Sequence, residues 1–197
     1  MIRIALTGSI GMGKSTVARM FEEKGIPLFD ADAVVRKLQG PSGALVGPIS
    51  EHFPAAVESG RLDRDKLAHI VLEDPAKLAE LEAIVHPAVR DAREAFIAAH
   101  RTAPALLFEI PLLFETGGDE AFDKVVVVSA PAAVQRKRVL ERPRMSEAKF
   151  RSILSRQLPD EEKRRRADFV VDTGTNLSTT RTQVEAIIAC LGLAPGR

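Results

Sequence analysis

A glycine-rich segment near the N-terminus, TGSIGMGKST at residues 7–16, has the composition and spacing of a phosphate-binding loop. Gly8 is followed by four residues and then by Gly13, Lys14 and Ser15. Glycines let the backbone N–H groups of such a loop point inward and approach a phosphate closely. The lysine can bind phosphate oxygens, and the serine hydroxyl can ligate Mg²⁺. The segment therefore predicts a binding site for a nucleoside triphosphate.

The residues on either side of this loop predict the elements that must hold it. The apolar run IRIAL (2–6) predicts a short buried strand, and KSTVARMFEEKG (14–25) predicts a helix that ends at Gly25. A strand, a glycine-rich loop and a helix N-terminus, in that order, form a phosphate-binding motif. This context argues against an accidental glycine-rich turn.

Two aspartates, Asp30 and Asp32, lie at and just after the end of the next apolar run, IPLFD at 26–30. A carboxylate at the end of a strand beside a phosphate-binding loop can accept a proton from an attacking hydroxyl or hold Mg²⁺. An aspartate there can instead cap the following helix. We expect Asp32 to be the base and Asp30 to be a cap or a partner of the metal.

Two other single residues are candidates with an open alternative. Glu109 lies at the end of the apolar run ALLFEI (105–110), where an acid can organise a metal ion or can be a paired or pKa-shifted carboxylate at the rim of the sheet. His86 precedes Pro87, which we expect to open a helix at its first position. A single histidine of this kind is either structural or functional.

A basic segment near the C-terminus contains two arginines at helical spacing. Residues 134–166 contain 12 Lys/Arg and 5 Asp/Glu, a local net charge of +7, whereas the rest of the chain carries −6. Arg138 and Arg142 are four residues apart and therefore share one face of a helix. Cations that a mobile lid brings over a transferring phosphoryl group stabilise its charge. The alternative is a solvated basic face, which is how we interpret EEKRRR at 161–166, with or without ion pairs among its charges.

The apolar runs and the segments between them predict the fold. Most runs are continuous rather than alternating, as in parallel strands that are covered on both faces. The pattern predicts an α/β fold with a parallel sheet of about five strands wrapped by helices. Two connections between strands, residues 31–104 and 131–166, are too long for simple crossovers, and their sequences predict helices. In a kinase, an insertion at the first of these positions would hold the acceptor substrate. The expected strands are 2–6, 26–30, 105–110, 124–130 and 168–172, and a last helix is expected at 176–192.

Composition excludes several classes of protein. The 197 residues suit one α/β domain with insertions, and a net charge of +1 provides no global field for nucleic acid. No apolar run approaches the ~20 residues of a membrane span. The lone Cys190 lies in an apolar helical pattern, so we expect a buried thiol. We expect a cytoplasmic protein, a monomer, with no nucleic-acid or membrane partner.

Taken together, the motifs resemble those of the dephospho-CoA kinase family over nearly the whole chain. The shared segments are LTGSIGMGKST (6–16), DAD (30–32), GRLDRDKLA (60–68), LEAIVHPAVR (81–90), PLLFE (111–115), Gln135 with Arg138 and Arg142, Gln157, and ADFVVDTG (167–174). Each motif alone is modest evidence for the family, but their combined order and spacing are specific to it.

The resemblance implies a P-loop kinase fold and ATP-dependent phosphorylation of the ribose 3′-hydroxyl of dephospho-CoA. It implies a nucleotide-binding core at 1–30, 105–130 and 167–197, a helical acceptor (CoA) domain at 31–104, and a lid at 131–166. It also identifies Asp32 as the base. ATP is the implied phosphoryl donor and Mg²⁺ the implied metal.

The same resemblance implies roles for individual residues. The catalytic group is Asp32, Lys14 and Arg138. The ATP-binding group is Gly8, Gly11, Met12, Gly13, Lys14, Ser15, Thr16 and Arg142, with Ser15 as the metal ligand. The substrate-binding group is Asp32, His86, Pro87, Arg90 and Leu113.

Three residues depart from the family pattern. Ser9 stands where glycine is usual, so the loop must tolerate a Cβ there. Pro143 follows Arg142 where aspartate is common and should end the lid helix. Thr173 replaces a common asparagine in the loop where the adenine base is expected.

Other functions fit the sequence less well. A GTPase would carry the guanine-reading sequence N-K-x-D, but Asn176, the only asparagine, is followed by leucine. A nucleic-acid-dependent ATPase would need a larger basic field and stacking aromatic residues. Another small-molecule or nucleotide kinase of the same fold is the serious alternative, because a fold does not fix its acceptor.

Overall fold

A computed structural model of the chain describes residues 1–193 of the 197. Residues 194–197, the end of the expected core segment, lie outside the described residues. The chain divides into two compact units, which are described separately below. The first unit is Met1–Phe29 with His100–Arg197, and the second is Asp30–Ala99.

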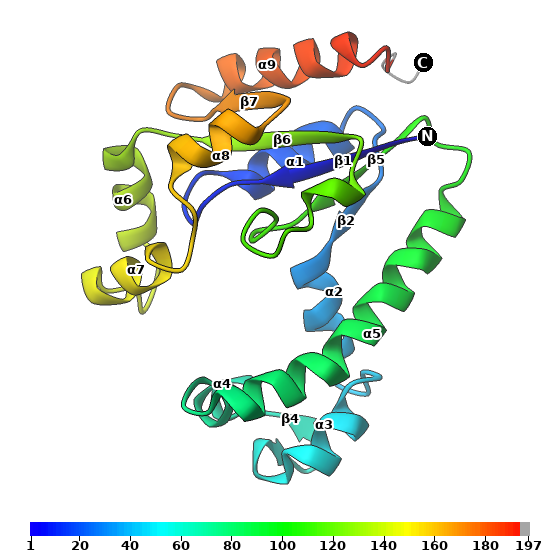
Figure 1. The fold of residues 1–197 in the computed structure, drawn as a ribbon, viewed down its shortest axis with the longest axis vertical. Helices are drawn as coiled ribbons and strands as arrows, with labels where there is room; N and C mark the ends of the chain where they lie inside the picture. The colour runs from blue at the N-terminus through cyan, green and yellow to red at the C-terminus, as the bar shows by residue number, and fades with distance from the viewer. Residues whose placement is uncertain (194–197) are drawn as a thin grey trace. The chain divides into compact units, whose positions relative to one another are not determined.

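The first unit is built on a five-stranded sheet with the strand order β2-β5-β1-β6-β7 (Figure 1). β1 pairs in parallel with β5 and with β6, and β6 pairs in parallel with β7. The predicted α/β fold with a five-stranded parallel sheet is confirmed. The strands are β1 (Ile2–Thr7), β2 (Leu28–Asp30), β5 (Ala105–Glu109), β6 (Lys124–Ser129) and β7 (Phe169–Asp172).

Both faces of this sheet are covered, which explains why its strands are continuous apolar runs. Successive side chains of a strand point to opposite faces. In β1, Ile4 and Leu6 join one apolar cluster while Ala5 joins another. In β6, Val126 and Val128 belong to the first cluster, and Val125 and Val127 belong to the second. The central strands therefore need apolar residues at every position, not at alternate ones.

Helices supply the other side of each cluster. Residues of α1 (Lys14–Glu22) and α9 (Leu177–Cys190) pack into the cluster of Ile4 and Leu6. The connection between β6 and β7 forms α6 (Ala132–Leu140), α7 (Glu147–Leu154) and α8 (Asp160–Arg166), and a short 3₁₀ turn, η2, lies at Asp119–Ala121. The first of these helices ends before Pro143, as predicted.

The prediction of a buried thiol at Cys190 is wrong, because this cysteine is exposed. The buried side of α9 follows Thr180, Val184, Ile187 and Ile188. Cys190 falls outside that stripe, at the last position of the helix.

The second unit is mainly helical, as predicted, and has an apolar core of its own. Leu45, Ile49, Phe53, Leu67 and Val71 form the centre of that core. The helices are α2 (Ala31–Leu38), α3 (Val46–His52), α4 (Arg64–Leu72) and α5 (Pro75–Ala99), with a 3₁₀ turn, η1, at Pro54–Ala56.

The second unit also contains a small hairpin that the sequence analysis does not predict. β3 (Val57–Glu58) pairs antiparallel with β4 (Arg61–Leu62). The two turn residues, Ser59 and Gly60, have φ values of +49° and +72°. A turn with two positive φ angles matches the twist of paired strands, and glycine adopts such an angle at little cost.

The expectation that Pro87 opens a helix is wrong. Pro87 lies inside α5, which runs without a break from Pro75 to Ala99. An internal proline removes one helical hydrogen bond and costs about 3 kcal/mol. Residues on both sides of it, Val85 and Ala88, pack against the core of the unit. We attribute the continuity of the helix to that packing.

No helix in the described part of the chain combines the length and the apolar character needed to cross a membrane.

Candidate active site

The phosphate-binding loop has a backbone that accepts only glycine at its critical positions. Gly8, Gly11 and Gly13 have φ values of +148°, +78° and +89°. A Cβ on Gly8 would lie 2.4 Å from the carbonyl oxygen of Val128, and one on Gly11 would lie 2.4 Å from Val139 Cγ2. Ser9 is not among the residues with positive φ, so the first departure from the family pattern requires no strained backbone.

The side chains after the loop bring a cation and two oxygen ligands together. Lys14 Nζ donates to the carbonyl oxygen of Gly8 at 2.7 Å, inside the loop. Ser15 Oγ donates to Glu109 Oε1 at 3.3 Å. Glu109 is only 7% exposed and lies at the end of β5. The serine hydroxyl and this carboxylate are hard oxygen donors of the kind that Mg²⁺ prefers.

Three residues from distant parts of the first unit hold the loop. Gln135 Nε2 donates to the Ile10 carbonyl at 2.8 Å, and the Ile10 N–H donates to Gln157 Oε1 at 3.1 Å. Thr173 Oγ1 donates to the Met12 carbonyl at 2.7 Å. These bonds tie the loop to α6, to the segment before α8 and to the end of β7. The loop is therefore fixed by side chains as well as by its own backbone.

Arg138 and Arg142 line one cavity of about 360 Å³ together with glycines of the loop. Arg138 lies on α6, whereas Arg142 lies just beyond the C-terminal end of that helix. A cavity of this volume is in the usual range for a small-molecule site. The structure thus brings together two of the predicted cations and the predicted phosphate site. The lining residues are Gly11, Gly13, Thr16, Arg138, Arg142, Thr173, Thr175, Asn176, Leu177 and Thr180.

Thr173, the third departure from the family pattern, lines that cavity and forms hydrogen bonds with both Arg138 and Met12. Arg138 Nη2 donates to the Thr173 carbonyl at 2.6 Å, and Arg138 Nη1 donates to Thr173 Oγ1 at 3.0 Å. Because Thr173 also contacts Met12, one threonine connects the arginine with the phosphate-binding loop. The hydroxyl supplies both an acceptor and a donor there.

The side chains and backbone of the first unit are suited to bind ATP and Mg²⁺. The cradle at Gly8 and Gly11 is so close to backbone and side chain that a Cβ would clash. A helix N-terminus, a lysine and two arginines are groups that can bind anions, and Ser15 with Glu109 would hold the metal through oxygen atoms.

Asp30 and Asp32 belong to the second unit and have different surroundings. Asp30 is the N-cap of α2, since its Oδ1 accepts a hydrogen bond from the Ala33 N–H at 2.8 Å. Its other oxygen lies 3.5 Å from Arg36 Nη2. Asp32 lies in the first turn of the helix and is exposed. The capping role expected for Asp30 is confirmed, and Asp32 presents its carboxylate to solvent.

The remaining predicted substrate-side residues separate into two groups. His86 and Arg90 are exposed on α5 and, being four residues apart, share one face, with Pro87 exposed next to them. Leu113 is fully buried in the apolar cluster of Ala5 and Val127. Its side chain is not exposed, and its expected contact with the substrate stays a prediction. Packing against the sheet takes that side chain into the core.

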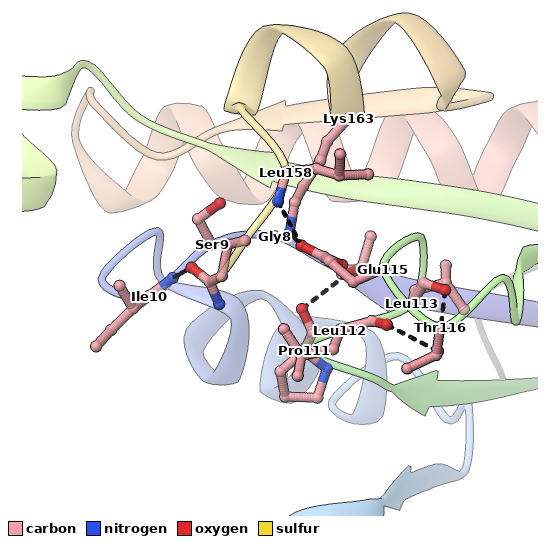
Figure 2. A network of polar contacts seen from close by, with 12 residues as sticks. Gly8, Ser9, Ile10, Pro111, Leu112, Leu113, Glu115, Thr116, Leu158 and Lys163 are labelled. Atoms are coloured by element: carbon pink, nitrogen blue, oxygen red, sulfur yellow. Dashed lines mark hydrogen bonds and ion pairs between the residues drawn. The ribbon is translucent and has the colours of Figure 1, made fainter. Parts of the chain in front are cut away.

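The sequence analysis missed a buried ion pair next to the loop. Lys163 Nζ lies 2.7 Å from Glu115 Oε1, and the two side chains are 0% and 12% exposed. Figure 2 shows these residues with Leu158, whose N–H donates to Glu115 Oε1 at 2.8 Å, and with Ile10 of the loop. The interpretation of 161–166 as wholly solvated is therefore wrong at Lys163. Its carboxylate partner is 48 residues away in the chain and takes it out of solvent.

Replacing Lys163 with methionine is expected to lower the free energy of unfolding by about 3–5 kcal/mol, because it leaves the Glu115 carboxylate buried without its cation. Urea unfolding of purified protein measures this loss. The double variant Lys163→Met/Glu115→Gln should recover part of it, since no buried charge is left alone. Equal losses in the single and double variants would contradict this reading of the pair.

The pH dependence of stability should reflect the same pair. Burial acts to raise the pKa of Glu115, but hydrogen bonds from Lys163 and from the Leu158 N–H outweigh it and hold the pKa below its usual 4.5. The carboxylate therefore stabilises the fold above its unfolded pKa, and this contribution is lost as pH falls through the lower folded pKa. Lys163→Met should lose that part of the acid dependence.

Comparison with known proteins finds similar sequences that match this chain over nearly its full length. A family model described as dephospho-CoA kinase matches residues 2–179. The dephospho-CoA kinase of Mesorhizobium japonicum is 54% identical over 190 residues, which is 95% of each chain. That of Agrobacterium fabrum is 52% identical over 195 residues, 98% of this chain and 99% of the relative. A crystal structure from Thermus thermophilus matches with a TM-score of 0.86 and 37% identity, covering 99% of this chain and 98% of that one.

Proposed function

The chain belongs to the dephospho-CoA kinase family, and from that premise we propose that it transfers the γ-phosphoryl group of ATP to the ribose 3′-hydroxyl of dephospho-CoA. The products are coenzyme A and ADP. The observation that carries the proposal is the cavity in which Arg138 and Arg142 line the same space as the phosphate-binding loop. Phosphoryl transfer depends mainly on positioning and on stabilising charge at the transferred group.

The residues of the first unit serve the donor. Backbone N–H groups of Gly11 and Gly13 and the amine of Lys14 bind the β- and γ-phosphates. Ser15 would hold Mg²⁺ with Glu109 beside it, and the bound metal would neutralise phosphate charge. Arg138 stabilises the charge that develops on the transferred group.

The residues of the second unit serve the acceptor. Asp32 takes the proton of the 3′-hydroxyl as the oxygen attacks, which makes a weak nucleophile stronger. Asp30 holds the N-terminus of α2 and thereby fixes where Asp32 lies on the helix. His86 and Arg90, on one exposed face of α5, bind other parts of the acceptor.

ADP formation by the purified protein should depend on both dephospho-CoA and Mg²⁺, and the second product should be coenzyme A. A coupled ADP assay with chromatography of the products measures this directly. Nucleoside monophosphates and shikimate are the comparison acceptors. Lys14→Ala is the control variant, which should lose activity with every acceptor. A much higher kcat/KM with a nucleoside monophosphate would reject the proposed acceptor.

The cellular setting follows from the substrates of the proposed reaction. Because ATP and a CoA precursor are small cytoplasmic metabolites, we propose that the protein works in the cytoplasm. For its oligomeric state we favour a monomer, and we expect no nucleic-acid partner. Light scattering after size-exclusion chromatography tests the oligomeric state.

A further inference from the structure

The second unit contains a basic pocket that is distinct from the loop described above. The pocket has a volume of about 370 Å³. Its charged lining residues are three arginines, and no acidic residue lines it. The lining residues are Arg36, Gln39, Gly40, Pro41, Arg61, Leu62 and Arg64. We call it the arginine pocket.

Local packing explains why the three arginines converge. Leu38 at the end of α2 and Leu62 in β4 both pack against the apolar core of the unit. Arg36 and Arg61, which lie close to these leucines in sequence, are left exposed at the pocket. Arg64 is the first residue of α4, directly after the capping residue of that helix. Packing on the core therefore brings the end of α2, strand β4 and the start of α4 together, and the arginines of these three segments line one pocket.

The positive charge of the pocket is largely uncompensated. Among the described residues, Arg61 and Arg64 take part in no ion pair, and Arg36 has only a 3.5 Å contact with Asp30. Three acids lie nearby in sequence: Glu58, Asp63 and Asp65. Glu58 and Asp63 lie 3.2 and 4.0 Å from Lys66 Nζ, and Asp65 forms no ion pair among the described residues and does not line the pocket. Two guanidinium groups are thus available to an anion.

The spacing of residues along α2 places Arg36 of the arginine pocket near the proposed base, Asp32. Asp32 and Arg36 are four residues apart on the same helix, so they share one face and lie about one turn, ~5.4 Å, apart along the axis. That spacing is comparable to the reach from a ribose 3′-oxygen to a phosphate on the 5′-oxygen. A nucleotide whose 3′-hydroxyl meets Asp32 can therefore extend its 5′-phosphates toward Arg36.

We propose that the arginine pocket binds the diphosphate of dephospho-CoA, the group that joins its adenosine to its pantetheine arm. This inference rests on the proposed function. A diphosphate offers two adjacent anionic groups, and the planar guanidinium forms paired hydrogen bonds with such oxygens. Neither the adenine nor the uncharged pantetheine arm would require three cations. The arginine pocket thus selects an acceptor that carries a 5′-diphosphate.

The test is steady-state kinetics of Arg61→Gln, Arg64→Gln and the double variant. Losing one charge-assisted hydrogen bond weakens binding about tenfold, so the KM for dephospho-CoA should rise about tenfold in each single variant and about 100-fold in the double one. The KM for ATP should not change. Lys77→Gln, an equal charge change at an exposed position of α5 outside the pocket, is the matched control and should behave as wild type.

Adenosine separates loss of the diphosphate contact from general damage. It has the ribose 3′-hydroxyl but no phosphate, so its inhibition constant against dephospho-CoA should be the same in wild type and variants. Arg61→Lys and Arg64→Lys should recover part of the loss because they keep the charge. Thermal melting checks that each variant folds. We expect each to fold, because Arg61 and Arg64 are exposed.

The outcomes separate this inference from the proposed function. An active wild type with an unchanged KM for dephospho-CoA in the double variant overturns the diphosphate assignment alone. A parallel weakening of adenosine inhibition overturns it as well, because the arginines would then act on the whole site. A wild type that is inactive with dephospho-CoA rejects the proposed function and this assignment with it.

Discussion

Asp32→Asn is expected to lower kcat by at least about 100-fold while the KM for ATP stays near wild type. General-base catalysis contributes about 10²–10⁴-fold, and an amide of the same size cannot accept the proton. Asp32 is exposed in the first turn of α2, so its replacement disturbs no buried contact. The loop proposed to bind ATP is not altered by this change. Steady-state turnover and a separate measurement of ATP affinity test the two parts of the expectation.

Asp30→Asn is the matched control for that experiment. Asp30 caps α2 by accepting the Ala33 N–H, and asparagine caps a helix about as well as aspartate. The variant also loses the 3.5 Å contact with Arg36, an exposed pair of a kind that contributes little to stability. We expect a much smaller loss of kcat than in Asp32→Asn. A severe loss in Asp30→Asn with normal turnover in Asp32→Asn would reverse the two roles.

The elements that hold the proposed ATP site could be predicted because they are governed by local patterns. A strand covered on both faces must be apolar throughout, and the run around Val126 shows this without reference to any partner. The glycines of the loop have the positive φ angles that their spacing predicts. The cap at Asp30 follows equally from residue type and position. In each case the local chemistry leaves few alternatives.

The contacts that were missed depend on residues far apart in the sequence. Thr173 contacts Met12 across 161 positions of the chain, and no local pattern shows such a bond. Pro87 has the local signature of a helix start, but packing on both sides of it keeps α5 continuous. The β3–β4 hairpin is a local feature and was missed for another reason: its strands have two residues each, too few for an alternating pattern to be recognised.

Lys163 was missed because its burial depends on how α8 packs and on a partner, Glu115, that is 48 residues away in the chain. It lies within a charged run, which usually indicates a solvated face. However, Ala167, four residues later, packs against the cluster that contains Leu113 and Phe114. Ala167 is the C-cap of α8, so the end of this helix is anchored to that cluster, and Lys163 is the buried residue of the helix. A carboxylate such as Glu115 near the same cluster is the partner that burial of a lysine requires.

Arg138→Ala is expected to lower kcat by about 100-fold or more, the scale of effect found when a positioned cation is removed from phosphoryl transfer. The arginine lies on α6 with Gly11 and Gly13 in the same cavity, which supports a role at the transferred phosphate. Its hydrogen bonds to Thr173 raise a second possibility, that it acts by holding the loop through Met12. The two roles predict different kinetics, and a set of variants separates them.

Thr173→Val removes the hydroxyl that bonds to Met12 but keeps the guanidinium of Arg138. If the arginine stabilises charge directly, Thr173→Val should raise the KM for ATP and change kcat little, whereas Arg138→Ala should mainly lower kcat. Arg138→Lys keeps a charge but loses the paired geometry and should fall between wild type and alanine. Lys137→Ala, an exposed neighbour on α6, should leave turnover unchanged. Matching losses of kcat in Thr173→Val and Arg138→Ala would instead assign Arg138 to positioning the loop.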